Sequence, residues 1–197
     1  MTKAEKTKRF IIERSAPIFN TKGIAATAMS DIMEVTKLSK GSLYVHFDNK
    51  DVLAGAAVDH NMDLLEKKVM AAVDQQKGAK AKLFAFIDVF MDPMDPPVRG
   101  GCPMMNFGTE VDDTDGPLRG RVSKAVEKSQ EVIVQLIRSG IREGVFRPDW
   151  NYKDFATMMF ATIEGGVVIS RIVGNNSKMK VIGRSLKQMI NEQSIQG

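Results

Sequence analysis

Residues 27–53 read TAMSDIMEVTKLSKGSLYVHFDNKDVL, and no other segment says as much about the fold. Its periodicity predicts two short helices, over residues 28–36 and 40–46, separated by a turn at Lys37-Leu38-Ser39. Five apolar residues recur at spacings that place them on the inner side of these helices: Ile32, Val35, Leu38, Leu43 and Phe47. Together with a supporting helix predicted over residues 3–21, this arrangement is typical of a helix-turn-helix.

The rest of the chain also has the period of α-helices, and it lacks the alternation between hairpin turns that predicts strands. Further helices are expected over residues 50–76, 78–90, 102–111, 117–143, 152–173 and 178–193. The run Asp92-Pro-Met-Asp-Pro-Pro97 is expected to be a loop, because a helix interior cannot accommodate three prolines within five residues. Residues 47–55 do not have the composition of a linker. The sequence therefore predicts an all-α protein with a rigidly joined N-terminal part.

Three segments within residues 27–53 closely resemble the DNA-binding signature of the tetracycline-repressor (TetR) family. They are residues 27–32, 38–47 and 49–53. The resemblance implies an N-terminal helix-turn-helix domain, expected over residues 1–49, and a C-terminal helical domain, expected over residues 50–197, that binds a small effector and forms a homodimer. Two residues depart from the family pattern, since Met33 and Lys37 stand where it often has Ala and Gly. A lysine at the turn is expected to be strained there, and it offers a further phosphate contact.

Eight residues of the signature, and Lys37 between its segments, are expected to bind double-stranded operator DNA. They are Thr27, Lys37, Ser39, Lys40, Gly41, Ser42, Tyr44, His46 and Lys50. Ser39 is a good N-cap, so the second short helix begins there and presents backbone N–H groups to phosphate and its first turn to the major groove. Thr27 and Lys50 flank the motif at helix starts, where phosphate contacts are expected. Taken singly, Tyr44 also suits a core aromatic, His46 a helix-capping residue and Lys50 a solvated charge.

The charge distribution separates the N-terminal segment from the rest of the chain. Residues 1–50 hold 9 Lys and Arg against 5 Asp and Glu, and the remaining residues hold 19 against 19, so the net charge of +4 lies in the first 50 residues. A basic segment on a neutral body indicates that the segment meets a polyanion.

The residue types that catalysis and metal binding use are scarce. The chain of 197 residues has one cysteine, two histidines and no glycine-rich nucleotide-binding motif, so no catalytic residue, metal or cofactor is expected. The acidic run Asp112, Asp113 and Asp115 is expected to be a solvated turn. Apolar stretches are interrupted by charge before the roughly 18 residues that a membrane helix needs, and the N-terminus lacks the apolar run of a signal peptide. The sequence predicts a cytoplasmic protein without membrane contact.

The helix over residues 152–173 is apolar nearly all round and contains Gly165-Gly166, which permit a close approach by another helix. With the last helix, it is expected to form a two-fold dimer bundle. A central core helix is the alternative.

An effector pocket is harder to place in the body. Thirteen methionines suit an adaptable apolar cavity, although core filling explains most of them equally well. Six residues are the expected lining: Phe84, Met104, Asn106, Phe107, Glu110 and Met159. Cys102 is expected at the N-terminus of a short helix, where a thiol gains reactivity, so it is a candidate sensor of oxidants or electrophiles. An inert buried thiol is the alternative.

These observations favour a transcriptional regulator, with repression as the expected direction, that binds a near-palindromic operator as a homodimer and is released by a small molecule. Two alternatives stay open at this point. One is an enzyme with a helical body, and the other is a constitutive DNA-binding or interaction protein without an effector.

Overall fold

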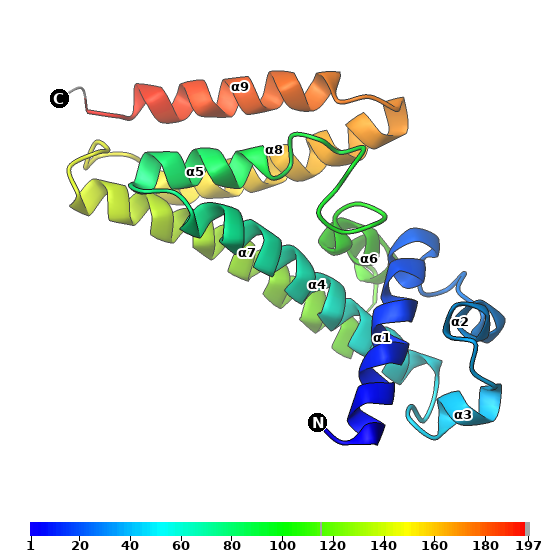
Figure 1. The fold of residues 1–197 in the computed structure, drawn as a ribbon. Coiled ribbons are helices and arrows are strands. Elements are labelled where there is room, and N and C mark those ends of the chain that lie inside the picture. Colours follow the sequence, from blue (N-terminus) through cyan, green and yellow to red (C-terminus); the bar gives the residue numbers. More distant parts are fainter. Residues whose placement is uncertain (115, 196–197) are drawn as a thin grey trace. The chain divides into compact units, whose positions relative to one another are not determined.

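The computed structural model describes residues 1–114 and 116–195, so Asp115 of the predicted acidic turn lies outside the described residues. Figure 1 shows a chain of helices, and the described residues contain one isolated β-bridge, between Phe146 and Ser194. The helices are α1 (Lys3–Lys22), α2 (Met29–Thr36), α3 (Lys40–Tyr44), α4 (Lys50–Asp74), α5 (Ala79–Asp88), α6 (Pro103–Val111), α7 (Pro117–Arg142), α8 (Tyr152–Val173) and α9 (Ser177–Glu192). The prediction of an all-α protein is confirmed.

The structure divides into two compact units. Unit 1 comprises Met1–Leu65 and Val98–Lys124, and unit 2 comprises Glu66–Pro97 and Ala125–Gly197. Helices α4 and α7 have residues in both units, whereas α1, α2, α3 and α6 belong to unit 1 and α5, α8 and α9 to unit 2. Unit 1 thus contains the predicted helix-turn-helix together with the first part of α4. The functional boundary predicted between residues 49 and 50 stays a prediction.

In unit 1, the first helix is fixed at both ends by local chemistry. Thr2 and Glu5 form a capping box, in which the Glu5 N–H donates to the Thr2 hydroxyl at 3.2 Å and the Thr2 N–H donates to the Glu5 carboxylate at 2.7 Å. The helix ends at Gly23, whose φ of 85° is readily available only to glycine. Between these ends, Ile11 and Phe19 are fully buried, and α1 packs on α2 and α6. Helix α1 therefore supports the motif as predicted.

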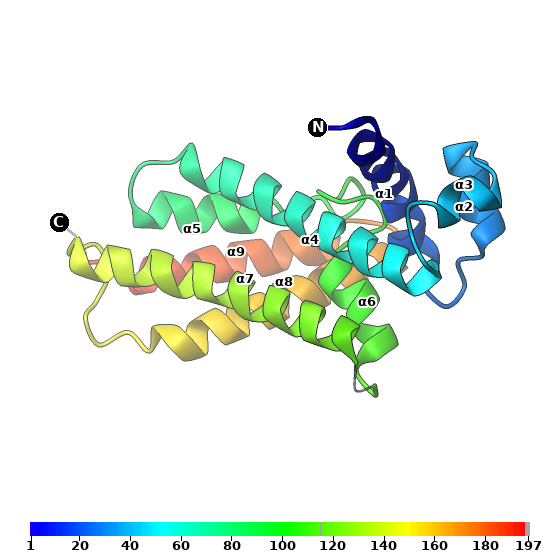
Figure 2. The same ribbon diagram turned by 90° about the horizontal axis from the view of Figure 1, so that it is seen from below.

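In unit 2, α9 packs along α8 and also contacts α5 (Figure 1, Figure 2). Gly166 of α8 lies at this contact, because a methyl group added there would collide with Ile182 and Met179 of α9. Gly165 has open space around it. The close approach expected at Gly165-Gly166 therefore occurs at Gly166 and within one chain. The expected close approach by another helix is met by α9 of the same chain, and the two-fold dimer bundle stays a prediction.

Helix α8 is buried on one side only. Its exposed apolar residues cluster in the C-terminal half, at Val168, Ile169, Ile172 and Val173, with Ile172 the most exposed at 79%. By length and composition alone, this helix is apolar enough to cross a membrane, with a mean hydropathy of 1.4, although Glu164 lies in it and 44% of its most apolar window is buried within the chain. A cluster of exposed apolar side chains on one side of a helix marks an interaction surface.

Candidate nucleic-acid interface

The first helix of the motif begins at a charged cap. The Ala28 N–H donates to Asp31 Oδ2 at 2.9 Å, and Lys22 Nζ donates to Asp31 Oδ1 at 2.8 Å. The hydrogen bond from Lys22, and after it the one from the Ala28 N–H, lowers the pKa of the Asp31 carboxyl. Asp31 thereby joins the end of α1 to the start of α2.

This cap predicts a pH-dependent stability. Because the pKa of Asp31 is lower in the folded protein, its contribution is fully present above the unfolded-state pKa of about 3.9 and is lost as the pH falls through the folded-state pKa. Asp31→Asn is expected to lower the melting temperature at neutral pH, and the difference from the wild type should narrow in acid. Thermal unfolding between about pH 7 and pH 2.5 measures this, with Asp63→Asn as the control. A difference that is the same at every pH would contradict the role of the charge.

The turn and the second helix follow the predicted pattern. Lys37 ends α2 in the left-handed region, with φ 57°, and is the one non-glycine residue of the described chain with positive φ. Ser39 caps α3, because its hydroxyl accepts the Ser42 N–H at 3.2 Å. Of the five residues predicted on the inner side of the motif, Ile32, Leu43 and Phe47 are buried, and Val35 and Leu38 are half-buried.

The outer side of α3 presents most of the predicted DNA-binding residues to solvent. The exposed members are Lys37, Ser39, Lys40, Gly41, Ser42 and Tyr44, and His46 is half-buried. Nothing lies within 4 Å of a Cβ built on Gly41, so another backbone has room to approach there. Lys40 Nζ lies 5.9 Å from the centre of the Tyr44 ring, and Tyr44 is 40% exposed. These exposed residues are the predicted reading surface, and they are called the reading surface below.

One exposed residue of this surface was not predicted from the sequence. Val45 follows α3 directly and is 79% exposed, although it is apolar. An exposed apolar side chain beside Tyr44 suits contact with a thymine methyl group in the major groove. Its place in the apolar pattern, two residues after the inward Leu43, gave no signal that it faces outward.

Two predicted phosphate contacts have other partners in the structure. Thr27 is 1% exposed, and its hydroxyl donates to the Gly23 carbonyl at 2.5 Å. Lys50 Nζ donates to the carbonyl oxygens of Ile24 at 2.9 Å and Thr27 at 3.1 Å. The buried Thr27 hydroxyl is out of reach of a phosphate, and the Lys50 ammonium joins the start of α4 to the segment before α2. Both contacts favour a role in positioning the motif.

The two lysines are expected to behave differently towards salt. Lys40→Met should reduce the slope of log affinity against log salt by about one unit for each bound helix-turn-helix motif, because an exposed ammonium at the reading surface is lost. Lys50→Met should lower the melting temperature and leave the slope unchanged, because it removes two internal hydrogen bonds. Operator titrations at several salt concentrations, with thermal unfolding of each variant, measure both effects. A reduced slope at unchanged stability in Lys50→Met would instead show that Lys50 contacts phosphate.

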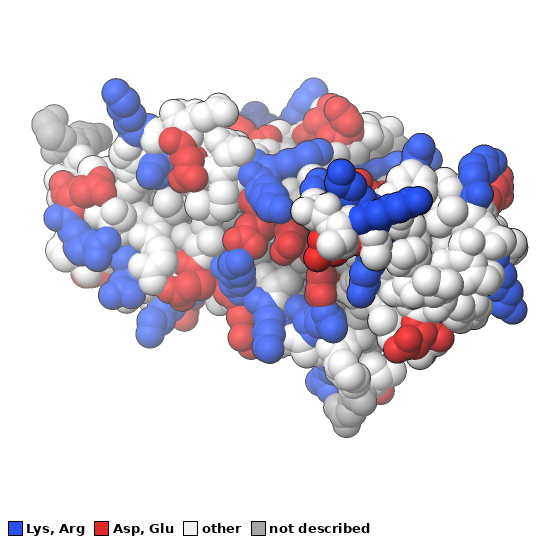
Figure 3. Space-filling model, turned by 60° about the horizontal axis from the view of Figure 1, so that its bottom comes forward, with Lys and Arg blue, Asp and Glu red and all other residues white. Residues whose placement is uncertain are grey.

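The space-filling view shows that Lys and Arg side chains are interspersed with Asp and Glu over the face drawn in Figure 3. No continuous basic field covers this face.

The polar residues predicted to line an effector pocket are engaged within unit 1. Glu110 of α6 accepts the Ile24 N–H at 2.9 Å and the Ala25 N–H at 3.1 Å. Asn106 Nδ2 donates to the Asn20 carbonyl at 2.9 Å, at the end of α1. These bonds connect α6 to the segment that leads into the motif. They engage the groups that were predicted to bind a ligand, and contact of these groups with an effector stays a prediction.

The other predicted lining residues are dispersed between the units. Met104 and Phe107 are buried in unit 1, Met159 is fully buried in unit 2, and Phe84 of unit 2 is half-buried. Cys102 immediately precedes α6, as expected, and is 6% exposed. Contact of these residues with an effector, and a sensor role for Cys102, stay predictions.

A capped α3 that faces solvent, joined to α2 by a tight turn and supported by α1, defines a helix-turn-helix protein. Comparison with known proteins narrows this class. The family pattern described as bacterial regulatory proteins, tetR family, matches residues 11–57, and the pattern described as tetracyclin repressor-like, C-terminal domain, matches residues 79–186.

Solved structures and a curated relative agree with these matches. A TetR-family transcriptional regulator from Cytophaga hutchinsonii is 33% identical, with 100% of this chain and 99% of that chain covered and a TM-score of 0.94. A TetR transcriptional regulator from Chloroflexus aurantiacus J-10-FL is 34% identical, with 98% of both chains covered and a TM-score of 0.93. The HTH-type transcriptional repressor DhaR of Mycobacterium sp. (strain GP1) is 20% identical over 87% of this chain and 86% of its own length.

The chain belongs to the TetR family of transcriptional regulators. It is a DNA-binding regulator and not an enzyme, which removes the helical-body enzyme from the alternatives.

Proposed function

We propose that the protein is a repressor that binds a near-palindromic operator as a homodimer and is released by a small-molecule effector. The observation that carries this proposal is the reading surface, in which a capped α3 exposes Lys40, Ser42 and Tyr44 while Leu43 is buried beneath it. A relative that carries the name of repressor supports repression as the direction.

At the operator, α3 lies in the major groove. The N–H groups at the start of this helix and the Lys37 and Lys40 ammonium groups bind phosphate, while Ser42, Tyr44 and Val45 reach base edges. His46 lies at the end of the helix as a further donor. Thr27 and Lys50 act behind this surface by fixing the segment between α1 and α2 through the bonds to Gly23, Ile24 and Thr27 carbonyls.

The dimer forms through the apolar α8–α9 face. This face consists of exposed residues of unit 2: Val168, Ile169, Ile172, Val173, Val181 and Met189. Water-exposed apolar residues from two antiparallel neighbouring helices are suited to an isologous four-helix contact with a second copy. Covering the face in this way also accounts for an apolar α8 in a cytoplasmic protein without membrane contact.

The effector acts through the helical body. Helix α4 runs unbroken from Lys50 to Asp74 and begins at the residue whose ammonium fixes the motif. Glu110 and Asn106 of α6 bind the end of α1 and the start of the segment between α1 and α2. A ligand that shifts α4 or α6 therefore changes how the reading surface is held, which is a route to release from the operator.

The test of the proposal is reciprocity between effector and operator. A compound that raises the melting temperature of the full chain is titrated into the protein with and without a saturating operator duplex. Coupling of about 1–3 kcal/mol predicts roughly 5- to 150-fold weaker ligand binding in the presence of DNA. Equal affinities would show that the ligand is not an inducer.

A further inference from the structure

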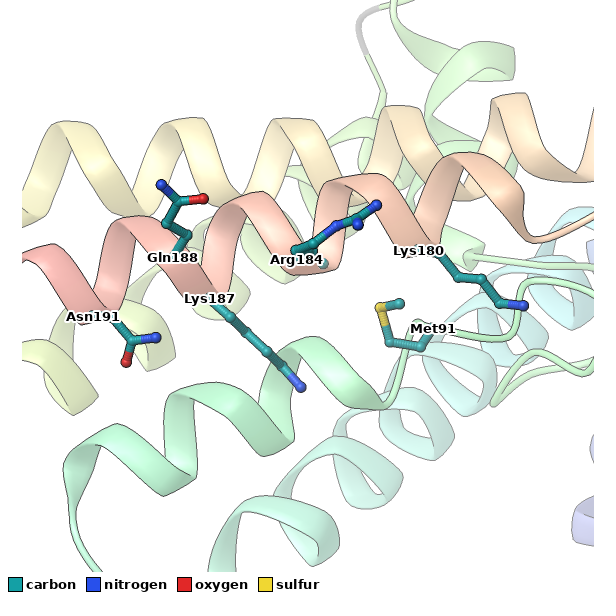
Figure 4. A pocket seen from close by; sticks show the side chains of 7 residues that line it. Met91, Lys180, Arg184, Lys187, Gln188 and Asn191 are labelled. Carbon is teal, nitrogen blue, oxygen red and sulfur yellow. The ribbon is translucent and has the colours of Figure 1, made fainter.

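A groove lies between α9 and the end of α5 in unit 2, and it takes no part in the reading surface (Figure 4). Its volume is about 480 Å³, which is enough for a small molecule. The lining residues are Met91, Lys180, Gly183, Arg184, Lys187, Gln188 and Asn191. The groove thus has three cationic side chains and no acidic one.

The basic residues share one face of α9. Lys180, Arg184, Lys187 and Asn191 follow one another at i, i+4, i+7 and i+11, a spacing that aligns side chains along a helix. Figure 4 shows Lys187 and Asn191 projecting from α9 toward α5, with Met91 between Lys187 and Lys180. This face differs from the buried face of α9 and from the side that carries Val181 and Met189. The side of the groove with Lys180, Lys187 and Asn191 therefore lies away from the proposed dimer face, whereas Arg184 and Gln188, three and seven residues after Val181, adjoin that face.

The charges of the groove are only partly balanced within the protein. Lys187 Nζ donates to Asp88 Oδ1 at 2.5 Å and lies 5.3 Å from the centre of the Phe84 ring. Among the described residues, Lys180 and Arg184 form no ion pair. Like charges four residues apart destabilise a helix, so the row of cations has a cost that a bound anion removes.

The rest of the lining suits a small ligand. A methyl group at Gly183 would collide with the Met91 sulfur, so this glycine lets the flexible thioether lie against α9 as an adaptable floor. The Asn191 amide supplies a further donor beside the cations. Gln188 is engaged with Glu192, to which its Nε2 donates at 3.0 Å. Charged and neutral donors over an apolar floor match an organic anion better than a bare inorganic ion.

We propose that this groove binds a small organic oxyanion with at least two negative charges, a polycarboxylate or a phosphate ester. The Arg184 guanidinium extends away from α5 in Figure 4, and we expect it to turn toward a bound anion, because its planar fork of donors matches a carboxylate or phosphate. Lys180 and Lys187 add point charges. The proposed site shares no lining residue with the reading surface or with the effector pocket predicted from the sequence.

Calorimetric titration of the full-length protein with citrate and with glycerol 2-phosphate at low ionic strength tests the proposal, and acetate serves as the singly charged control. We expect saturable binding of at least one dianionic or trianionic probe and none of acetate. Lys180→Gln and Arg184→Gln should each weaken binding about five- to tenfold. Lys153→Gln, which removes an exposed lysine of α8 in the same unit, should have no effect. Equal weakening by Lys153→Gln would show non-specific charge attraction and overturn the site.

A fourth variant is expected to improve binding, which loss of structure cannot do. Asp88→Asn removes the carboxylate that competes for Lys187, so the bound anion should be held about three- to tenfold more tightly. Unchanged or weaker binding in a folded Asp88→Asn variant would contradict the assignment of Lys187 to the site. Failure of the wild type to bind either multiply charged probe would overturn the proposal as a whole.

Discussion

Glutamate in place of Ile172 is expected to convert the homodimer into monomers and to weaken operator binding roughly 100-fold or more. Ile172 is 79% exposed near the C-terminal end of α8 and is the most exposed residue of the apolar α8–α9 face, so the variant should fold normally as a monomer. In the dimer, two symmetry-related carboxylates would be buried close together without partners, which is strongly unfavourable. Loss of the dimer lowers operator affinity, because the second DNA-binding motif no longer binds at the high effective concentration that the first one provides.

Light scattering after size exclusion measures the oligomeric state of this variant, and fluorescence anisotropy with an operator duplex measures its affinity. Met94→Glu is the matched control, because Met94 is an exposed methionine of unit 2 outside α8 and α9. It should remain a dimer with full operator affinity. An intact dimer in Ile172→Glu would place the interface elsewhere.

Tyr44→Ala should reduce the free energy of operator binding by about 1–3 kcal/mol for each helix-turn-helix motif, and a dimer has two such motifs. Tyr44 is 40% exposed on α3 and stacks near the Lys40 ammonium, so its loss removes a direct contact and frees a basic side chain that it helps to orient. The fold should be little affected, because Leu43 and Phe47, and not Tyr44, make the inner contacts.

Anisotropy titration of the same duplex checks this expectation, and Tyr44→Phe separates the hydroxyl from the ring. Base recognition by the hydroxyl predicts that Tyr44→Phe loses most of the affinity that Tyr44→Ala loses. Orientation of Lys40 by the ring predicts that Tyr44→Phe binds like the wild type. Wild-type affinity in Tyr44→Ala would remove this residue from the interface.

The local features of the motif were predictable because neighbouring residues determine them. The N-cap at Ser39 and the inward Leu43 follow from short-range spacing, and the structure has both. The turn also follows, since Lys37 at the end of α2 adopts the strained backbone that its position predicts.

The partners of distant side chains were not predictable from spacing. Lys50 binds a carbonyl 26 residues earlier in the chain, and Glu110 caps N–H groups about 86 residues earlier. Helical period shows which side of a helix is apolar, but it does not show which helix lies against that side. For the same reason, the glycine pair predicts that another helix approaches α8, but it does not identify that helix as α9 of the same chain.

The same limit applies to the effector pocket and to the basic groove. Residues chosen for a pocket because they are apolar, such as Phe107 and Met159, are fully buried core residues. The groove of Lys180, Arg184 and Lys187 needs α5 beside α9 to become concave, and no spacing within α9 indicates that neighbour.

The proposed function depends above all on the exposed α3 reading operator DNA as part of a dimer. To test this, the wild-type protein is titrated into a duplex from the region upstream of its own gene, and the complex is footprinted with hydroxyl radicals. We expect two protomers per duplex and two protected half-sites of inverted sequence about 34 Å apart, with the affinity lost on a scrambled duplex. Equal binding to the scrambled duplex, or a single protected half-site at saturation, would contradict operator recognition by a dimer.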